Sequence, residues 1–334
     1  MKIETVGDIL DALPPVADAG ATVEQKATVR APGKPTVKPI ILAPGAYDAD
    51  TVPIEDYHGR EICPAPSISS SGLKLLHGCS PRHYWWQSAL NPDRPAQETK
   101  RHFSVGKAVH DRLLLGSRWP AFYHILPEGF SRAKSKAMAD EIAEADAAEA
   151  AGKVLLSIDD AVMVNALVES IQSDKLLARA FERGEAETTF AWQDEATGVW
   201  VRARPDCMTP DRVVVLDVKA MADASPDAMR RSIRNYGYLQ SASLYLDGVE
   251  AVTGERPREF WLVAPEKAAP FPVGVYPLDM GDIARAGFHF NRPALDTFAR
   301  CLEADDWPAY PMQTLGMSDW DRRNLDKKEM TDGE

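Results

Sequence analysis

The sequence lacks both the long apolar run of a membrane protein and the paired cysteines of a zinc-binding one. No stretch of its 334 residues approaches the roughly 20 consecutive apolar residues that a membrane helix needs. No CxxC pair occurs among its four cysteines, which argues against zinc fingers and ribbons; these are Cys63, Cys79, Cys207 and Cys301. The N-terminus also lacks a basic segment followed by an apolar stretch. We therefore expect no secretory signal, no membrane partner and a cytoplasmic location.

Positive charge is also in deficit. The chain has 38 Lys and Arg residues against 50 Asp and Glu, which gives a net charge of −12. This balance argues against a protein that coats nucleic acid non-specifically. It leaves open an enzyme that acts on nucleic acid through a local basic groove, with clustered carboxylates that hold metal ions.

Residues 1–55 differ in composition from the rest of the chain. They are rich in Pro, Ala, Val and Thr and poor in aromatic residues, so they can bury little apolar surface. We expect a flexible tail there, followed by one folded domain over residues 56–334. The apolar residues near the start fall at helical spacing: Ile3, Val6, Leu10 and Leu13. This stripe is either a solvated helix or a docking peptide for a partner.

The periodicity of the remaining chain predicts a block of helices, a block of strands, and then both together. We expect helices beginning after Ser69 and at Pro81, over 103–115, 133–151 and 158–183, from Ser225, and over 236–252 and 281–303. We expect strands over 188–193, 199–206, 213–219, 260–263 and 273–276, the first two as a hairpin. This order predicts an α/β fold with a mixed central β-sheet flanked by helices.

The run from Val213 to Lys219 places two charges in an otherwise apolar strand. The three valines and the leucine that precede Asp217 predict a strand that is buried on both faces. Asp217 and Lys219 are two residues apart, so their side chains point to the same side. Unpaired charges are costly inside a sheet. The pair is therefore either a salt bridge at the strand end or part of a chemical site.

The preceding predicted strand ends in a second acid, Asp206. If the two strands are neighbours, Asp206 lies beside Asp217, and two adjacent carboxylates repel unless a cation separates them. Magnesium prefers carboxylates completed by water and phosphate oxygens. A nearby lysine such as Lys219 can act on the attacking water and offset the developing phosphoryl charge. The layout indicates phosphodiester hydrolysis.

Five segments of the chain resemble those of the PD-(D/E)xK nuclease superfamily, and they follow one another in the same order as in that superfamily. Within it they are most similar to the RecE-like (exodeoxyribonuclease VIII-type) phage recombination exonucleases. Pro205-Asp206 with Asp217-Val218-Lys219 is similar to the signature itself, and Arg204-Pro205-Asp206 to its RPD form. Three further segments resemble the GxxxH helix, the QxxxY helix and the opening helix of this branch: Gly106–His110, Tyr236–Gly248 with Gln240 and Tyr245, and Ile68–Leu73 with Ser80-Pro81. The resemblance covers about residues 57–310.

The resemblance implies a restriction-endonuclease-like core and a metal site. Asp206 and Asp217 would bind Mg²⁺, with Mn²⁺ as a substitute, together with the His110 side chain and the Val218 carbonyl. Lys219 would act on the nucleophilic water. No iron–sulfur cluster is expected, because the chain lacks the late cysteine cluster of the members that carry one.

Further matched residues would brace the site or contact DNA. Gln240 would brace the site, although it stands five positions before Tyr245 where the family has four. Ser71 would contact a terminal 5′-phosphate, and Arg204 would bind DNA. Arg230 and Arg234 either line a DNA channel or form an ordinary solvated helix face.

The resemblance implies a Mg²⁺-dependent exodeoxyribonuclease that degrades linear double-stranded DNA from its ends, 5′→3′, in phage-type homologous recombination. It would form a homo-oligomer and leave a 3′ single strand for a RecT-like single-strand annealing protein. The alternatives are an endonuclease or a Cas4-like end processor of the same fold, or a non-catalytic module that binds DNA or a partner. The acidic net charge and the irregular Gln–Tyr spacing favour the non-catalytic alternative.

Overall fold

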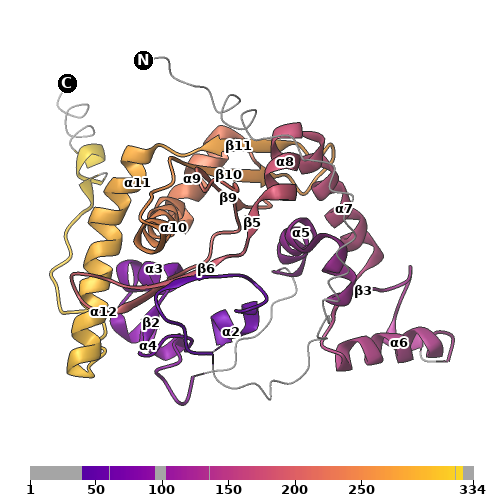
Figure 1. Ribbon diagram of the computed structural model, residues 1–334, viewed down its shortest axis with the longest axis horizontal. Helices are drawn as coiled ribbons and strands as arrows, with labels where there is room; N and C mark the ends of the chain where they lie inside the picture. The colour runs from indigo at the N-terminus through magenta and orange to yellow at the C-terminus, as the bar shows by residue number, and fades with distance from the viewer. Residues whose placement is uncertain (1–39, 60, 95–102, 135, 320, 326–334) are drawn as a thin grey trace.

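The computed structural model describes residues 40–59, 61–94, 103–134, 136–319 and 321–325 (Figure 1). Its helices are α2 (Ile54–Gly59), α3 (Ser70–Gly78), α4 (Pro81–Gln87), α5 (Phe103–Leu115), α6 (Ala139–Ala150), α7 (Ile158–Ser173), α8 (Lys175–Arg183), α9 (Pro226–Tyr236), α10 (Tyr238–Thr253), α11 (Met280–Ala286) and α12 (Arg292–Ala304), with short turns η1 (Gly116–Ala121), η2 (Arg132–Lys134) and η3 (Gly287–Asn291). Its strands are β1 (Gly45–Tyr47), β2 (Ser67–Ile68), β3 (Tyr123–Ile125), β4 (Val154–Leu156), β5 (Glu185–Ala186), β6 (Thr189–Gln193), β7 (Trp200–Ala203), β8 (Cys207–Met208), β9 (Val214–Val218), β10 (Glu259–Pro265) and β11 (Val273–Pro277).

The fold is α/β, with mixed sheets flanked by helices, as predicted. The five-stranded sheet has the order β11-β10-β9-β8-β5, in which β9 and β10 are parallel and the other pairs antiparallel. A four-stranded sheet has the order β1-β6-β7-β2. The predicted hairpin is β6–β7, in this second sheet. The predicted strand 199–206 is therefore divided, because the chain leaves one sheet after Ala203 and enters the other at Cys207.

Strand β9 is apolar on both faces because helices cover both. Val214, Leu216 and Val218 belong to the hydrophobic cluster that includes α5, α7 and α8. Val215 belongs to the cluster built with α3, α10 and α12. Figure 1 shows α10 and α5 on opposite sides of these strands. Because side chains alternate along a strand, Asp217 points to the same side as Val215, toward α3 and α10.

The expected boundary between tail and domain at residue 55 is wrong for residues 40–55. Strand β1 pairs with β6, and Leu42 and Val52 are buried in a small cluster beneath it. Its few apolar residues pack against one another and against Ala191 and Trp200, far along the chain, so composition alone does not reveal this cluster. Residues 1–39, which include the predicted apolar stripe, lie outside the described residues.

Two predicted helices have different bounds in the structure. The helix expected over 158–183 is divided into α7 and α8 at Asp174, whose carboxylate accepts hydrogen bonds from the Leu176 and Leu177 amides as an N-cap. The helix expected over 133–151 begins only at Ala139. Within the described part of the chain, no helix is both long enough and apolar enough to cross a bilayer.

Candidate functional site

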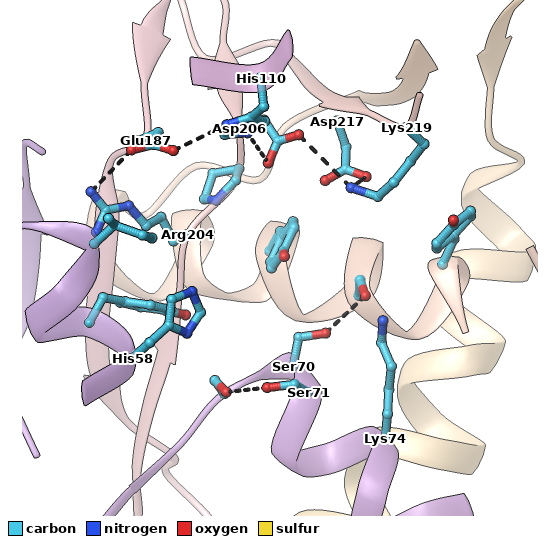
Figure 2. A pocket seen from close by; sticks show the side chains of 17 residues that line it. His58, Ser70, Ser71, Lys74, His110, Glu187, Arg204, Asp206, Asp217 and Lys219 are labelled. Atoms are coloured by element: carbon cyan, nitrogen blue, oxygen red, sulfur yellow. Dashed lines mark hydrogen bonds and ion pairs between the residues drawn. The ribbon is translucent and has the colours of Figure 1, made fainter. Parts of the chain in front are cut away.

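A pocket of about 280 Å³ opens at the C-terminal end of β9. Its walls come from α2, α3, α5, α10 and the crossing between the two sheets. Figure 2 shows two groups of side chains that face each other across it: Asp206, Asp217 and Lys219 on one wall, and Ser70, Ser71 and Lys74 of α3 on the other.

The antiparallel pairing of β8 with β9 brings the two acids together. Cys207 is opposite Leu216, so Asp206, one residue before Cys207, lies next to Asp217. The Val218 amide donates a hydrogen bond of 2.7 Å to Oδ2 of Asp206, which fixes this carboxylate at the strand end. Adjacent acids require neighbouring strands, and β8 and β9 are such a pair.

Four of the expected site residues meet in the pocket. The Lys219 ammonium lies 2.5 Å from Asp217 Oδ2 and 3.9 Å from Asp206 Oδ2. Nε2 of His110, from α5, lies 3.0 Å from Asp206 Oδ1. Lys219 also donates to the Val218 carbonyl at 3.3 Å, so this carbonyl faces the same space as the two carboxylates.

The electrostatics of this cluster are strongly coupled. Burial and the neighbouring charge of Asp206 raise the pKa of Asp217 to about 6. Burial opposes the charge of Asp206, but His110 and Lys219 hold its pKa below the usual range. Burial likewise disfavours the Lys219 ammonium, but Asp217 and Asp206 raise its pKa above the ordinary value. Lys219 is therefore a cation, and Asp217 ionises only at the cost of repulsion from Asp206.

The donor set of this cluster fits a divalent cation. Two carboxylates and a backbone carbonyl are hard oxygen donors of the kind that Mg²⁺ and Mn²⁺ prefer, and an imidazole adds to them without selecting a soft metal. The buried acids Asp206 and Asp217 gain from a cation because it relieves their mutual repulsion. The same oxygens already hold one positive group, the Lys219 ammonium.

A further pair of acids, Asp111 and Glu187, lies behind His110. Nδ1 of His110 is 3.4 Å from Glu187 Oε1 and 3.6 Å from Asp111 Oδ1, and the three residues are close enough to hold an ion themselves. However, the other oxygen of Asp111 accepts hydrogen bonds from Lys107 at 2.5 Å and Tyr123 at 2.6 Å. We therefore assign these acids to orienting His110 from its Nδ1 side, with Nε2 toward Asp206.

Sequence reasoning missed Glu187 because it belongs to no motif. It follows the two-residue strand β5 and adopts a positive φ of 49°, and its amide donates to the Asp206 carbonyl at 2.9 Å. Only the β5–β8–β9 pairing brings it to the pocket. The only sequence feature that links Asp111 to the site is its position directly after His110 on the helix.

Arg204, expected to contact DNA, is among the residues that line the pocket, although most of its surface is covered. Its side chain is buried, donates to the Val52 carbonyl at 2.9 Å and lies 3.5 Å from Glu187 Oε2. The guanidinium also lies over the Tyr57 ring. Arg204 thus helps to position Glu187 at the pocket, and its contact with DNA stays a prediction.

The role of Gln240 as a brace stays a prediction. Gln240 is buried, is not among the residues that line the pocket, and its backbone carbonyl accepts from Asn291. The next residue, Ser241, lines the pocket together with Tyr245 and accepts a hydrogen bond of 2.9 Å from Ser70. Ser241 and Tyr245 are four positions apart, so they share one face of α10, whereas a residue five positions away does not.

The remaining expected DNA contacts divide between the pocket and the surface. Ser71 lines the pocket on α3, with its hydroxyl 3.0 Å from that of Ser69. Arg230 and Arg234 are exposed on α9 and do not line the pocket. Lys74, one turn after Ser71, belongs to none of the sequence motifs and was not expected at the site. It lines the pocket, and burial lowers its pKa to about 8.

Comparisons with known proteins agree with this fold. Residues 69–314 match a family described as "PDDEXK-like domain of unknown function (DUF3799)". A crystal structure from Eubacterium rectale, described as a "putative exonuclease", resembles the chain with a TM-score of 0.52 and 15% sequence identity, over 76% of this chain and 92% of that one. At this identity the likeness shows a shared fold. No curated protein matches the chain significantly.

Proposed function

Because the chain belongs to the DUF3799 family of PDDEXK-like domains, we propose that it is a metal-dependent deoxyribonuclease, an exonuclease that hydrolyses phosphodiester bonds at the ends of linear double-stranded DNA. One observation carries the proposal. Asp206, Asp217 and Lys219 meet His110 in one pocket, although the helix that bears His110 lies almost a hundred residues earlier in the chain. A salt bridge at a strand end would need only the Asp217–Lys219 pair.

Each residue then has a definite chemical task. Asp206, Asp217, the Val218 carbonyl and Nε2 of His110 would hold Mg²⁺ or Mn²⁺. Such an ion polarises the phosphoryl group and acidifies a bound water. Lys219, kept cationic by the two acids, is a hydrogen-bond donor. It orients the attacking water and offsets the negative charge that develops on the phosphate, rather than removing a proton.

The opposite wall of the pocket supports binding of a phosphate. Ser70 and Ser71 lie in the first turn of α3, where backbone amides and hydroxyls favour an anion. Lys74 adds a positive charge to the same wall. We assign Ser71 to a terminal 5′-phosphate, which would make the enzyme act from DNA ends.

The direction of degradation and the biological setting rest on the resemblance to RecE-like exonucleases. By that resemblance the enzyme degrades 5′→3′ in phage-type recombination as a homo-oligomer. The 3′ single strand that it leaves would pass to a RecT-like annealing protein. An endonuclease or a Cas4-like end processor would share the same pocket, so the substrate decides between them.

The test compares linear duplex DNA, labelled at each 5′ end in turn, with a covalently closed circle of the same sequence, in Mg²⁺ and in EDTA. We expect Mg²⁺-dependent release of nucleotides from the linear DNA and an intact circle. Lys219→Ala should abolish release, whereas Lys175→Ala, an exposed lysine at the start of α8, should not. Nicking of the circle would overturn the exonuclease assignment. Binding without hydrolysis by the wild type would favour a non-catalytic module.

A further inference from the structure

Two tyrosines stack at the rim of the pocket, where α9 passes into α10. Tyr236 ends α9 and Tyr238 begins α10, and between them Gly237 has a φ of 61°, a left-handed conformation that glycine adopts without strain. The tight turn brings the two rings together, with centroids 5.7 Å apart and planes inclined by 25°. The pair is thus a preformed aromatic stack.

The two rings face different surroundings. Tyr238 lines the pocket, and the Lys219 ammonium lies 5.8 Å from its ring centroid. Tyr236 is 62% exposed, although large aromatic residues are usually covered. The stack therefore connects the proposed catalytic lysine to the surface, and Tyr236 is accessible to solvent.

Positive groups flank this stack. Lys74 donates a hydrogen bond of 3.0 Å to the Tyr236 carbonyl, and its alkyl chain packs against the Gly237 turn, so its charge is held beside the rings. Arg231 and Arg234 are exposed in the last turns of α9, directly before Tyr236. An accessible aromatic ring beside a fixed cation, with further arginines exposed on the same helix, suits single-stranded nucleic acid, in which bases stack and phosphates pair with basic groups.

We propose that Tyr236 and Tyr238 form a stacking platform for an unpaired base of the DNA strand that enters the pocket, with Lys74 and Arg234 on the adjoining phosphates. The inference rests on the proposed function, since it takes the occupant of the pocket to be DNA. It adds a substrate feature, namely that the strand reaches the catalytic cluster unpaired. The continuity with the pocket and the flanking charges favour a nucleobase over an apolar protein surface.

The test measures binding of a single-stranded oligonucleotide that carries 2-aminopurine near one end, in EDTA so that hydrolysis does not interfere. Stacking on Tyr236 quenches the fluorescence of the analogue. Tyr236→Ala should weaken binding about 5- to 100-fold, the usual contribution of one stacked base, and should restore fluorescence. Tyr236→Phe should behave like the wild type, because stacking needs the ring and not the hydroxyl.

Tyr310→Ala is the matched control, since Tyr310 is 61% exposed, is not among the pocket-lining residues and contacts His83. If Tyr236→Ala and Tyr310→Ala bind and quench alike, the platform does not exist. This result is separable from failure of the proposed function. A wild type that quenches through Tyr236 but never hydrolyses DNA would overturn the nuclease and keep the platform. If the wild type hydrolyses DNA but Tyr236→Ala changes neither binding nor fluorescence, the platform is overturned and the nuclease is kept.

Discussion

Replacement of Asp217 by asparagine should make the protein more stable, although it removes a central residue of the proposed site. Asp217 is 3% exposed, and burial together with Asp206 raises its pKa from 3.8 to about 6. Because the folded state binds this proton more tightly than the unfolded state, stability falls as pH rises from about 4 to about 6 and stays reduced above that. Asparagine resembles the protonated carboxylic acid and carries no charge, so it does not lose stability as the pH rises.

The size of the effect follows from the pKa shift. A shift of about two units corresponds to about 3 kcal/mol at pH 8 and to under about 1 kcal/mol at pH 4. Urea denaturation of Asp217→Asn and wild type in EDTA at the two pH values measures the difference. We expect the variant to be more stable by about that amount at pH 8, with most of the gain absent at pH 4.

Asp194→Asn is the matched control with the opposite sign. Burial opposes the charge of Asp194 as well, but hydrogen bonds from Arg292 and Thr197 lower its pKa. Its ionised form therefore stabilises the fold, and the amide should lower stability at pH 8. If Asp217→Asn destabilises the protein at pH 8 as Asp194→Asn does, or if its gain is the same at both pH values, the two acids of the pocket do not repel each other and the reasoning fails.

Two further predictions concern the groups that surround the acids. Glu187→Gln should weaken Mn²⁺ binding about 10- to 100-fold in calorimetry, because the carboxylate that orients His110 is lost. The control Glu185→Gln breaks only a pair with Arg212 and should leave the Mn²⁺ affinity unchanged. Equal affinities of the two variants would show that Glu187 does not belong to the site. The affinity of the free protein for DNA should fall as pH rises through about 8, since burial lowers the pKa of Lys74 to that value and the lysine then loses its charge. Lys74→Arg should abolish this inflection because a guanidinium stays charged, and an inflection that persists in the variant would assign it to another group.

The parts of the site that the sequence predicted well are those determined by local periodicity. The valines around Asp217 required a strand covered on both faces, and the spacing of Asp217 and Lys219 put both on one side. The apolar pattern of α5 likewise placed a helix over Phe103–Leu115. These predictions need only the geometry of a single element, so tertiary structure had little opportunity to alter them.

The parts that the sequence predicted poorly depend on contacts between distant elements. Glu187 reaches the pocket because β5 is the edge of a five-stranded sheet, and Arg204 is held by the Val52 carbonyl, 152 residues earlier in the chain. Gln240 matched a motif letter, yet the helical phase of α10 turns Ser241 and Tyr245 to the pocket instead. A one-residue difference in register is about 100° on a helix, which motif spacing alone does not resolve.

The position of a bound metal ion would show whether the two acids form a metal site. Crystals soaked in Mn²⁺ and measured at the manganese absorption edge would show the ion by anomalous scattering. We predict a peak bounded by Asp206, Asp217, the Val218 carbonyl and Nε2 of His110. A peak on the Nδ1 side of His110, between Asp111 and Glu187, or the absence of any peak at saturating Mn²⁺, would show that Asp206 and Asp217 are not the metal site.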